Sequence, residues 1–311
     1  MSTNDPAVRL AHRLQYWGAR AVLGLFGGLP RRTARSLGAL VGFLVYLFHR
    51  RLRCVGARNL ELVFPALAAP QRRAILRGEF RQLGWLLAEF AHFPHYTPEN
   101  IEDVIVYDGY ENYQRAVAGG KGVLYLTAHM SAWELGSFAH SLHGHPVRYL
   151  NRPLENPLVD ALINRYRCLW GSVAIDRRNS ARPVLEHLRQ GGAVGILIDQ
   201  NVLPEDGVVF ADFLGLLAAT TTGLARFALR TGAAVLPALV VWDKELGKYR
   251  LQFDPPVELV RTGDTEADVA AATARFNQLL ESYVRRYPDQ WLWVHRRWRT
   301  RPPGQPLLYS V

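Results

Sequence analysis

The feature that most constrains the fold is a regular alternation of short apolar strands and amphipathic helices from residue 104 onward. The predicted strands lie near residues 104–107, 122–127, 146–150, 172–175, 193–198, 234–241 and 249–254. The predicted helices lie near residues 110–118, 131–142, 157–170, 181–190, 219–231 and 266–286. Alternation of this kind predicts an α/β fold with a mixed, mostly parallel central sheet and helices on both faces.

One stretch within this alternation carries a candidate site. Residues 122–127 (Gly-Val-Leu-Tyr-Leu-Thr) are a continuous apolar run, which is typical of a central strand covered on both faces. His129 follows where the C-terminal edge of the sheet would lie, and ligands bind at that edge in open α/β sheets. Ser131 and Glu134 have the spacing of a capping box for the next helix. The sequence therefore predicts that His129 and Glu134 face each other across a strand-to-helix corner.

An imidazole beside a carboxylate is suited to general-base catalysis. Histidine has an ordinary pKa of about 6.5, so it can accept a proton near neutral pH. A carboxylate on the other ring nitrogen fixes the tautomer and stabilises the imidazolium. We interpret His129 as a base that acts on a substrate hydroxyl, and Glu134 as the group that orients it. The alternative is that Ser131 and Glu134 only cap a helix and His129 is a loop residue.

The segment His129-x-x-x-x-Glu134 resembles the HxxxxD/E motif of the membrane-bound glycerolipid and lipid A acyltransferases. Its Glu version is similar to the late lauroyl and myristoyl acyltransferases of lipid A biosynthesis. Further segments that resemble this family follow in the family's order over residues 50–311. They are Arg58–Pro65, Arg152–Asp160, Asp176-Arg177, Asp199-Gln200, Val209-Phe210, Ala219–Gly223, Trp291–Arg297 and Arg301–Pro306.

This resemblance implies transfer of a fatty acyl group from an acyl carrier protein thioester to a hydroxyl of a lipid A precursor. It also implies an inner-membrane location, with the catalytic domain facing the cytoplasm. Acyl carrier protein and CoA both remain possible donors, and we expect no metal and no further cofactor. The Glu-Gly-Thr-Arg segment of glycerol-phosphate acyltransferases is absent from the sequence, which argues against a glycerophospholipid acceptor. Another glycolipid acceptor such as a phosphatidylinositol mannoside, a thioesterase-like hydrolase and a non-catalytic membrane-associated protein are the alternatives.

Direct attack by the acceptor hydroxyl is favoured over a covalent acyl-enzyme. The sequence has no GxSxG nucleophile elbow, and neither Cys54 nor Cys168 lies in a nucleophile-like or metal-binding pattern. Ser131 is the remaining candidate nucleophile, but a capping serine has its oxygen engaged with backbone N–H groups.

Four further residues are candidates for substrate binding. Arg152 and Arg177 each follow a predicted strand and can bind phosphate or sugar oxygens, with ordinary surface ion pairing as the alternative. Asp199 ends an apolar strand, where it can pair with an arginine, help to place the acceptor, or cap a turn. Thr221 lies in a run, residues 219–223, that is predicted to open a helix and form an anion site; plain helix capping is the alternative.

Residues 1–50 are predicted to form a membrane anchor or interfacial helices, and residues 51–311 the acyltransferase domain. The apolar runs 21–29 and 37–48 are each shorter than the ~20 residues that span a bilayer, and a buried helical hairpin is the alternative. A net charge of +10 favours an anionic membrane and an acidic carrier protein, and no nucleic-acid motif is present. The mixture of tryptophan and arginine over residues 291–301 suggests a membrane interface or a lid.

Overall fold

The computed structural model describes residues 10–204 and 207–309, so the first nine residues of the predicted membrane segment lie outside the described residues. The helices are α1 (Leu10–Gly27), α2 (Arg31–Phe48), α3 (Arg50–Val63), α4 (Ala69–Ala91), α5 (Tyr110–Ala118), α6 (Trp133–Leu142), α7 (Pro157–Arg167), α8 (Ala181–Arg189), α9 (Gly223–Thr231) and α10 (Thr265–Arg286). The strands are β1 (Ile105–Asp108), β2 (Val123–Thr127), β3 (Arg148–Asn151), β4 (Val173–Asp176), β5 (Ala193–Leu197), β6 (Val208–Phe213), β7 (Leu216–Thr221), β8 (Ala234–Asp243) and β9 (Lys248–Phe253).

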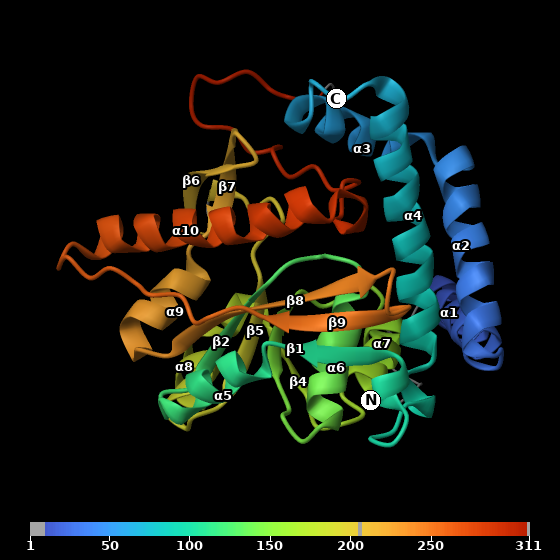
Figure 1. Cartoon of the computed structure of the whole chain (residues 1–311), viewed down its shortest axis with the longest axis horizontal. Helices are drawn as coiled ribbons and strands as arrows, with labels where there is room; N and C mark the ends of the chain where they lie inside the picture. Colours follow the sequence, from blue (N-terminus) through green and yellow to red (C-terminus); the bar gives the residue numbers. More distant parts are fainter. Residues whose placement is uncertain (1–9, 205–206, 310–311) are drawn as a thin grey trace.

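The central sheet has seven strands in the order β1-β9-β8-β2-β5-β3-β4 (Figure 1). Strand β2 lies in the middle and pairs in parallel with both β5 and β8. The pairing of β8 with β9 is antiparallel, whereas β1 is parallel to β9. The predicted mixed, mostly parallel sheet is therefore confirmed.

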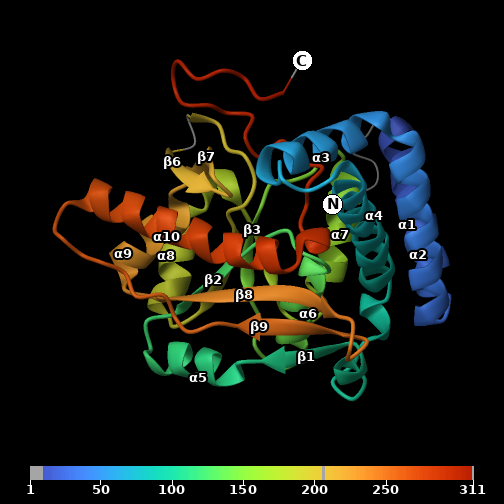
Figure 2. The ribbon, with the colours of Figure 1, turned by 45° about the horizontal axis from the view of Figure 1, so that its top comes forward.

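Helices cover both faces of this sheet, because the central strands are apolar on both sides. Along β2, Leu124 and Leu126 join a core cluster with residues of α8, α9 and α10. Val123 and Tyr125 join a second cluster with residues of α5, α6 and α7. Figures 1 and 2 show α10 on one side of the sheet and α5 and α6 on the other. Both faces of β2 are buried, as the continuous apolar run predicts.

A two-stranded hairpin of β6 and β7 corrects one predicted helix boundary. The predicted helix over residues 219–231 begins only at Gly223, because residues 216–221 pair antiparallel with residues 208–213. The run from Ala219 to Thr221 is therefore the end of a strand. The sequence analysis does not predict this hairpin. Its two strands pair only with each other, outside the alternating strands and helices of the main sheet.

The four helices α1 to α4 form the N-terminal part of the described chain. Figures 1 and 2 show α1 and α2 on the outer side of α4, away from the sheet. Within residues 10–204 and 207–309, no helix combines the length and the apolar character needed to cross a membrane.

Helices α2 and α4 pack with their backbones in direct contact. A Cβ atom added to Gly84 would lie 1.9 Å from the carbonyl oxygen of Gly38, and one added to Gly42 would lie 2.1 Å from the carbonyl oxygen of Phe80. Since real Cβ contacts are never so short, any larger residue would push the helices apart. The small residues therefore fix how closely the N-terminal helices approach the rest of the fold.

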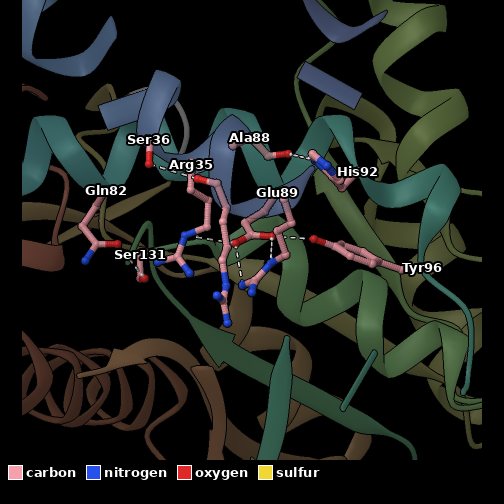
Figure 3. Close-up of polar contacts among 10 residues, drawn as sticks. Arg35, Ser36, Gln82, Ala88, Glu89, His92, Tyr96 and Ser131 are labelled. Carbon is pink, nitrogen blue, oxygen red and sulfur yellow. Dashed lines mark hydrogen bonds and ion pairs between the residues drawn. The ribbon is translucent and has the colours of Figure 1, made fainter. Parts of the chain in front are cut away.

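A buried ion-pair network reinforces this packing (Figure 3). Glu89 of α4 is fully buried and accepts two hydrogen bonds from Arg31 of α2, at 3.0 and 2.8 Å, and one from the Tyr96 hydroxyl at 2.5 Å. The Arg35 guanidinium lies 3.6 Å from the same carboxylate and stacks on the rings of Trp85 and Trp242 at 4.1 and 3.9 Å. One carboxylate thus holds two arginines of α2 against α4 and the sheet.

Replacing Gly84 with alanine should separate α2 from α4. We expect Gly84→Ala to lower the free energy of unfolding by about 1–3 kcal/mol, which is typical of overpacking. The matched control is Gly24→Ala in α1, because a Cβ there has no atom within 4 Å. Alanine is also the better helix former, so the control should be neutral or slightly stabilising. Thermal unfolding measures both, and equal melting temperatures for the two variants would contradict the close-packing argument.

Removing the charge of Glu89 should leave two partly buried arginines without their anion. We expect Glu89→Gln to cost about 3–5 kcal/mol, as when one partner of a buried pair is lost. Glu61→Gln is the control, since Glu61 pairs with Arg58 at 3.9 Å and both side chains are about half exposed. That change should cost less than about 1 kcal/mol. Denaturant unfolding compares the two, and similar small losses would show that the Glu89 network contributes little.

Candidate active site

The site lies where two neighbouring parallel strands end. Strands β2 and β5 pair in register up to Thr127 and Leu197. His129 and Asp199 each lie two residues beyond these partners, so the register brings their side chains together. The C-terminal edge of a parallel sheet is the usual ligand edge, as predicted from the sequence for His129.

His129 is held by Asp199 through two hydrogen bonds. Its Nδ1 atom lies 2.8 Å from Asp199 Oδ1, and its backbone N–H donates to Asp199 Oδ2 at 2.9 Å. Because an ionised carboxylate only accepts, Nδ1 carries the proton and Nε2 carries the lone pair when the ring is neutral. The amide nitrogen of Gln200 lies 3.2 Å from Nε2. The imidazole is thus oriented with its basic nitrogen on the side away from Asp199.

The environment of Asp199 keeps it ionised. Its side chain is only 1% exposed, and burial by itself would raise its pKa. The charge and the two hydrogen bonds of His129, with the Trp291 indole N–H that donates at 2.9 Å, outweigh burial and lower the pKa to about 2. A buried anion beside a histidine is the arrangement that stabilises an imidazolium.

The predicted pairing of Glu134 with His129 is wrong. Glu134 instead receives a bidentate pair from Arg167, with Nε donating at 2.8 Å and Nη2 donating to the other carboxylate oxygen. Arg167 ends α7, and burial would lower its pKa, but Glu134 reverses the direction and raises it. Glu134 lies in the first turn of α6, whereas the carboxylate that reaches His129 follows the neighbouring strand β5. Asp199, expected among the substrate-binding residues, is therefore the partner of the imidazole.

Ser131 does not cap α6, so the predicted capping box is also wrong. Its backbone has a φ of +48°, its N–H donates to the Gln290 carbonyl at 2.7 Å, and its hydroxyl donates to Gln82 at 3.2 Å (Figure 3). The helix begins at Trp133 instead of residue 131. A left-handed residue two positions after His129 makes the turn tight, and contacts with α4 and Gln290 hold it in place.

A cavity of about 810 Å³ opens beside His129. His129, Glu134, Arg152, Arg177 and Thr221 all line it, so the structure brings together five of the six predicted site residues. Thr221 ends β7, and its hydroxyl accepts the Gly223 N–H at 3.3 Å. Asp199 lies behind His129, outside the lining. The cavity is also lined by Arg167, Gln200 and Arg226, which are polar side chains outside the predicted set of site residues.

The C-terminal aromatic segment supports the site from behind. Trp291, Trp293, Trp298 and Arg297 are all buried, so the predicted membrane interface at residues 291–301 is wrong, whereas Leu292 of the same segment lines the cavity. The Arg297 guanidinium donates to the backbone carbonyl of Gln200 at 3.2 Å and to that of Ala219 at 2.6 Å. Burial lowers its pKa to about 10, which leaves it a cation at neutral pH. This segment therefore fixes the loop that carries Asp199 and Gln200.

The pairings that sequence reasoning missed share one property: the two partners are distant in the chain. Asp199 is 70 residues from His129, and Arg167 is 33 residues from Glu134. Only the position of Asp199 directly after an apolar strand was a usable signal, because neighbouring parallel strands end at one edge. Within the described part of the chain, no three metal-ligating side chains cluster.

Comparison with known proteins gives one consistent family. The family model of bacterial lipid A biosynthesis acyltransferases matches residues 1–300. The lipid A biosynthesis palmitoleoyltransferase of Escherichia coli (strain K12) is 31% identical over 294 residues, which cover 94% of each chain. The lauroyltransferase of the same organism is 30% identical with the same coverage. A lipid A biosynthesis acyltransferase of Haemophilus influenzae is 28% identical, with 99% of each chain covered.

The lowered pKa of Asp199 predicts how its contribution to stability depends on pH. Because the folded pKa of about 2 lies below the ordinary value of about 3.9, the carboxylate adds stability that is complete above about pH 4 and lost as the pH falls through 2. Asp199→Asn cannot titrate, so its deficit in unfolding free energy should shrink between about pH 5 and pH 2.

Urea unfolding at a series of pH values measures this deficit. Gln200→Ala is the control, since it alters a neighbouring side chain that has no titrating group. A deficit for Asp199→Asn that stays constant over the same pH range would contradict the ion pair with His129.

Proposed function

Because the chain belongs to the bacterial lipid A biosynthesis acyltransferase family, we propose that it transfers a fatty acyl group to a hydroxyl of a lipid A precursor. The relatives at 30–31% identity are named as lipid A palmitoleoyl- and lauroyltransferases, which supports an O-acyltransferase with this acceptor. The observation that carries the chemistry is the imidazole of His129, which borders the cavity while Asp199 holds its Nδ1.

In this proposal, Nε2 of His129 removes the proton of the acceptor hydroxyl, which takes the place of the Gln200 amide. The hydroxyl oxygen attacks the thioester carbonyl carbon, a C–O bond forms, and the C–S bond breaks. The departing thiolate takes the proton back from the imidazolium. Asp199 stabilises the imidazolium throughout, and general-base catalysis of this kind contributes about 10²–10⁴-fold.

The first turn of α6 is suited to hold the developing oxyanion. Trp133 and Glu134 border the cavity, and the first N–H groups of any helix lack carbonyl partners within that helix. Such donors stabilise negative charge where it forms in the transition state. We assign Glu134 the role of holding Arg167 at this wall, so that the guanidinium has one fixed direction.

The remaining arginines suit an acidic acceptor. Arg152, Arg177 and Arg226 line the same cavity as His129. Arg226 also pairs with Glu266 at 2.7 Å, on the outer side of the cavity. Guanidinium groups bind phosphate and sugar oxygens through paired N–H donors. Thr221 lines the same cavity and offers a hydroxyl to the same ligand.

We assign the donor to acyl carrier protein, because an acidic carrier complements a chain of net charge +10. Residues 1–50 serve as the membrane-associated part and residues 51–311 as the acyltransferase domain, at the inner membrane and facing the cytoplasm. Exposed apolar side chains on α1 and α2 support an interfacial attachment, since apolar patches of this kind mark contact surfaces. They are Leu10, Leu14, Trp17, Val22, Leu25, Leu40, Phe43, Leu44, Leu47 and Phe48.

An acyl-transfer assay tests the proposal directly. The purified full chain is given acyl carrier protein or CoA thioesters, with a lipid A precursor, a phosphatidylinositol mannoside or no acceptor. We expect transfer to the lipid A precursor from the carrier protein. Hydrolysis without any acylated lipid product would instead indicate a thioesterase, and transfer only to another lipid would move the acceptor assignment.

The same assay distinguishes the role of Asp199 from that of Glu134. His129→Ala and Asp199→Asn should each lower kcat by at least ~10²-fold. Glu134→Gln and Arg167→Gln should be non-additive in a double-mutant cycle, because each removes the same ion pair. Asp108→Asn is the control, since Asp108 pairs with Arg250 at 3.3 Å on an edge strand. Full activity of Asp199→Asn would contradict the assigned base.

A further inference from the structure

One face of α6 forms a wall of the cavity along its length. Trp133, Gly136, Ser137 and His140 line the cavity at helical spacing. Trp133 lies at the His129 end, where the two rings are 5.1 Å apart. With a rise of 1.5 Å per residue, His140 lies about 10 Å further along the helix axis. The cavity therefore runs inward from the candidate base between α6 and the sheet.

The opposite wall is the face of the sheet beneath α6. Tyr125 of β2, Gly195 of β5, Val240 of β8 and Phe253 of β9 all line the cavity. A Cβ added to Gly136 would lie 2.5 Å from Val240, so this glycine allows α6 to lie close to the sheet. The inner part of the cavity thus lies between α6 and the sheet with mainly apolar walls, which suits a hydrocarbon chain.

Far from His129, the α6 wall of the cavity meets a hydrogen-bonded aromatic group. His140 is 2% exposed, and its two ring nitrogens lie 2.9 Å from the Tyr107 hydroxyl and 2.8 Å from the Tyr125 hydroxyl. The Phe253 ring lies 5.5 Å from the imidazole. A neutral imidazole accepts from one hydroxyl and donates to the other, so both nitrogens are satisfied. Burial lowers the pKa of His140 to about 3, and the ring is therefore uncharged at neutral pH.

We propose that His140, held between Tyr107 and Tyr125 and packed on Phe253, is the end wall of the acyl groove and sets the length of the transferred chain. The inference rests on the proposed acyl transfer. A chain whose end reaches His140 buries every methylene, whereas a longer chain meets a ring that two hydrogen bonds and the surrounding aromatic rings hold in place. Each buried CH₂ favours binding, so the preferred donor is the longest one that fits.

Gly195 offers a way to shorten the groove without damaging the wall. It pairs with Tyr125 on one side and Tyr149 on the other. A Cβ added there would have Val147 at 3.6 Å as its nearest atom, which is an ordinary contact. Gly195→Ala therefore places a methyl group at the cavity wall beside Tyr125 with little strain.

The test measures kcat/KM for a series of saturated acyl carrier protein thioesters, each two carbons longer than the last. We expect His140→Ala to raise the relative kcat/KM of the next longer donor by about tenfold, the effect of burying about two more methylenes. Gly195→Ala should shift preference toward the next shorter donor. This second variant keeps the inference falsifiable if His140→Ala does not fold.

Tyr110→Phe is the matched control. The Tyr110 hydroxyl bonds His145 at 3.1 Å, a similar tyrosine–histidine contact that lies outside the cavity lining. Its chain-length profile should match that of the unaltered protein. Profiles unchanged in both test variants would overturn the inference alone. Absence of transfer from every donor in the unaltered protein would overturn the proposed function and the inference together.

Discussion

The bond between His129 and Asp199 is the contact on which the site depends. It joins the ends of two adjacent parallel strands, so it exists only if β2 and β5 pair in the observed register. A slip of one residue would turn the side chains to the other face of the sheet. The site therefore depends on this register, which the packing of β2 against both core clusters helps to hold.

Helix α4 links this site to the N-terminal helices. On one side, Gly84 and Glu89 hold α2. On the other, Gln82 accepts the Ser131 hydroxyl next to His129, and Glu79 accepts the Val294 N–H at 3.0 Å. Buried polar groups need such partners, so α4 is constrained along most of its length. The loop that carries the base and the helices outside the sheet thus share one rigid support.

Local patterns in the sequence were enough to predict most elements and the position of His129. The run over residues 122–127 is apolar because both of its faces are buried, and that pattern is visible without a partner. The sequence did not show which side chain each charged residue of the site contacts. Glu134 lies five residues from His129, yet it turns to Arg167, because the first turn of α6 directs it across the cavity to the end of α7. The aromatic segment at residues 291–301 was misread because tryptophan and arginine suit an interface as well as a buried, hydrogen-bonded core.

Where Gly38 and Gly42 meet α4, backbone contacts backbone, so no side chain can repack between the two helices at those points. This contact, together with the ion pairs of Glu89, opposes tilting or sliding of α2 along α4. If the exposed apolar faces of α1 and α2 rest on a bilayer as proposed, the entrance beside His129 stays at one height and one angle above the lipid surface. The acceptor must then rise out of the leaflet to meet the imidazole. The enzyme would therefore distinguish acceptor lipids by how far their sugar hydroxyls protrude from the leaflet.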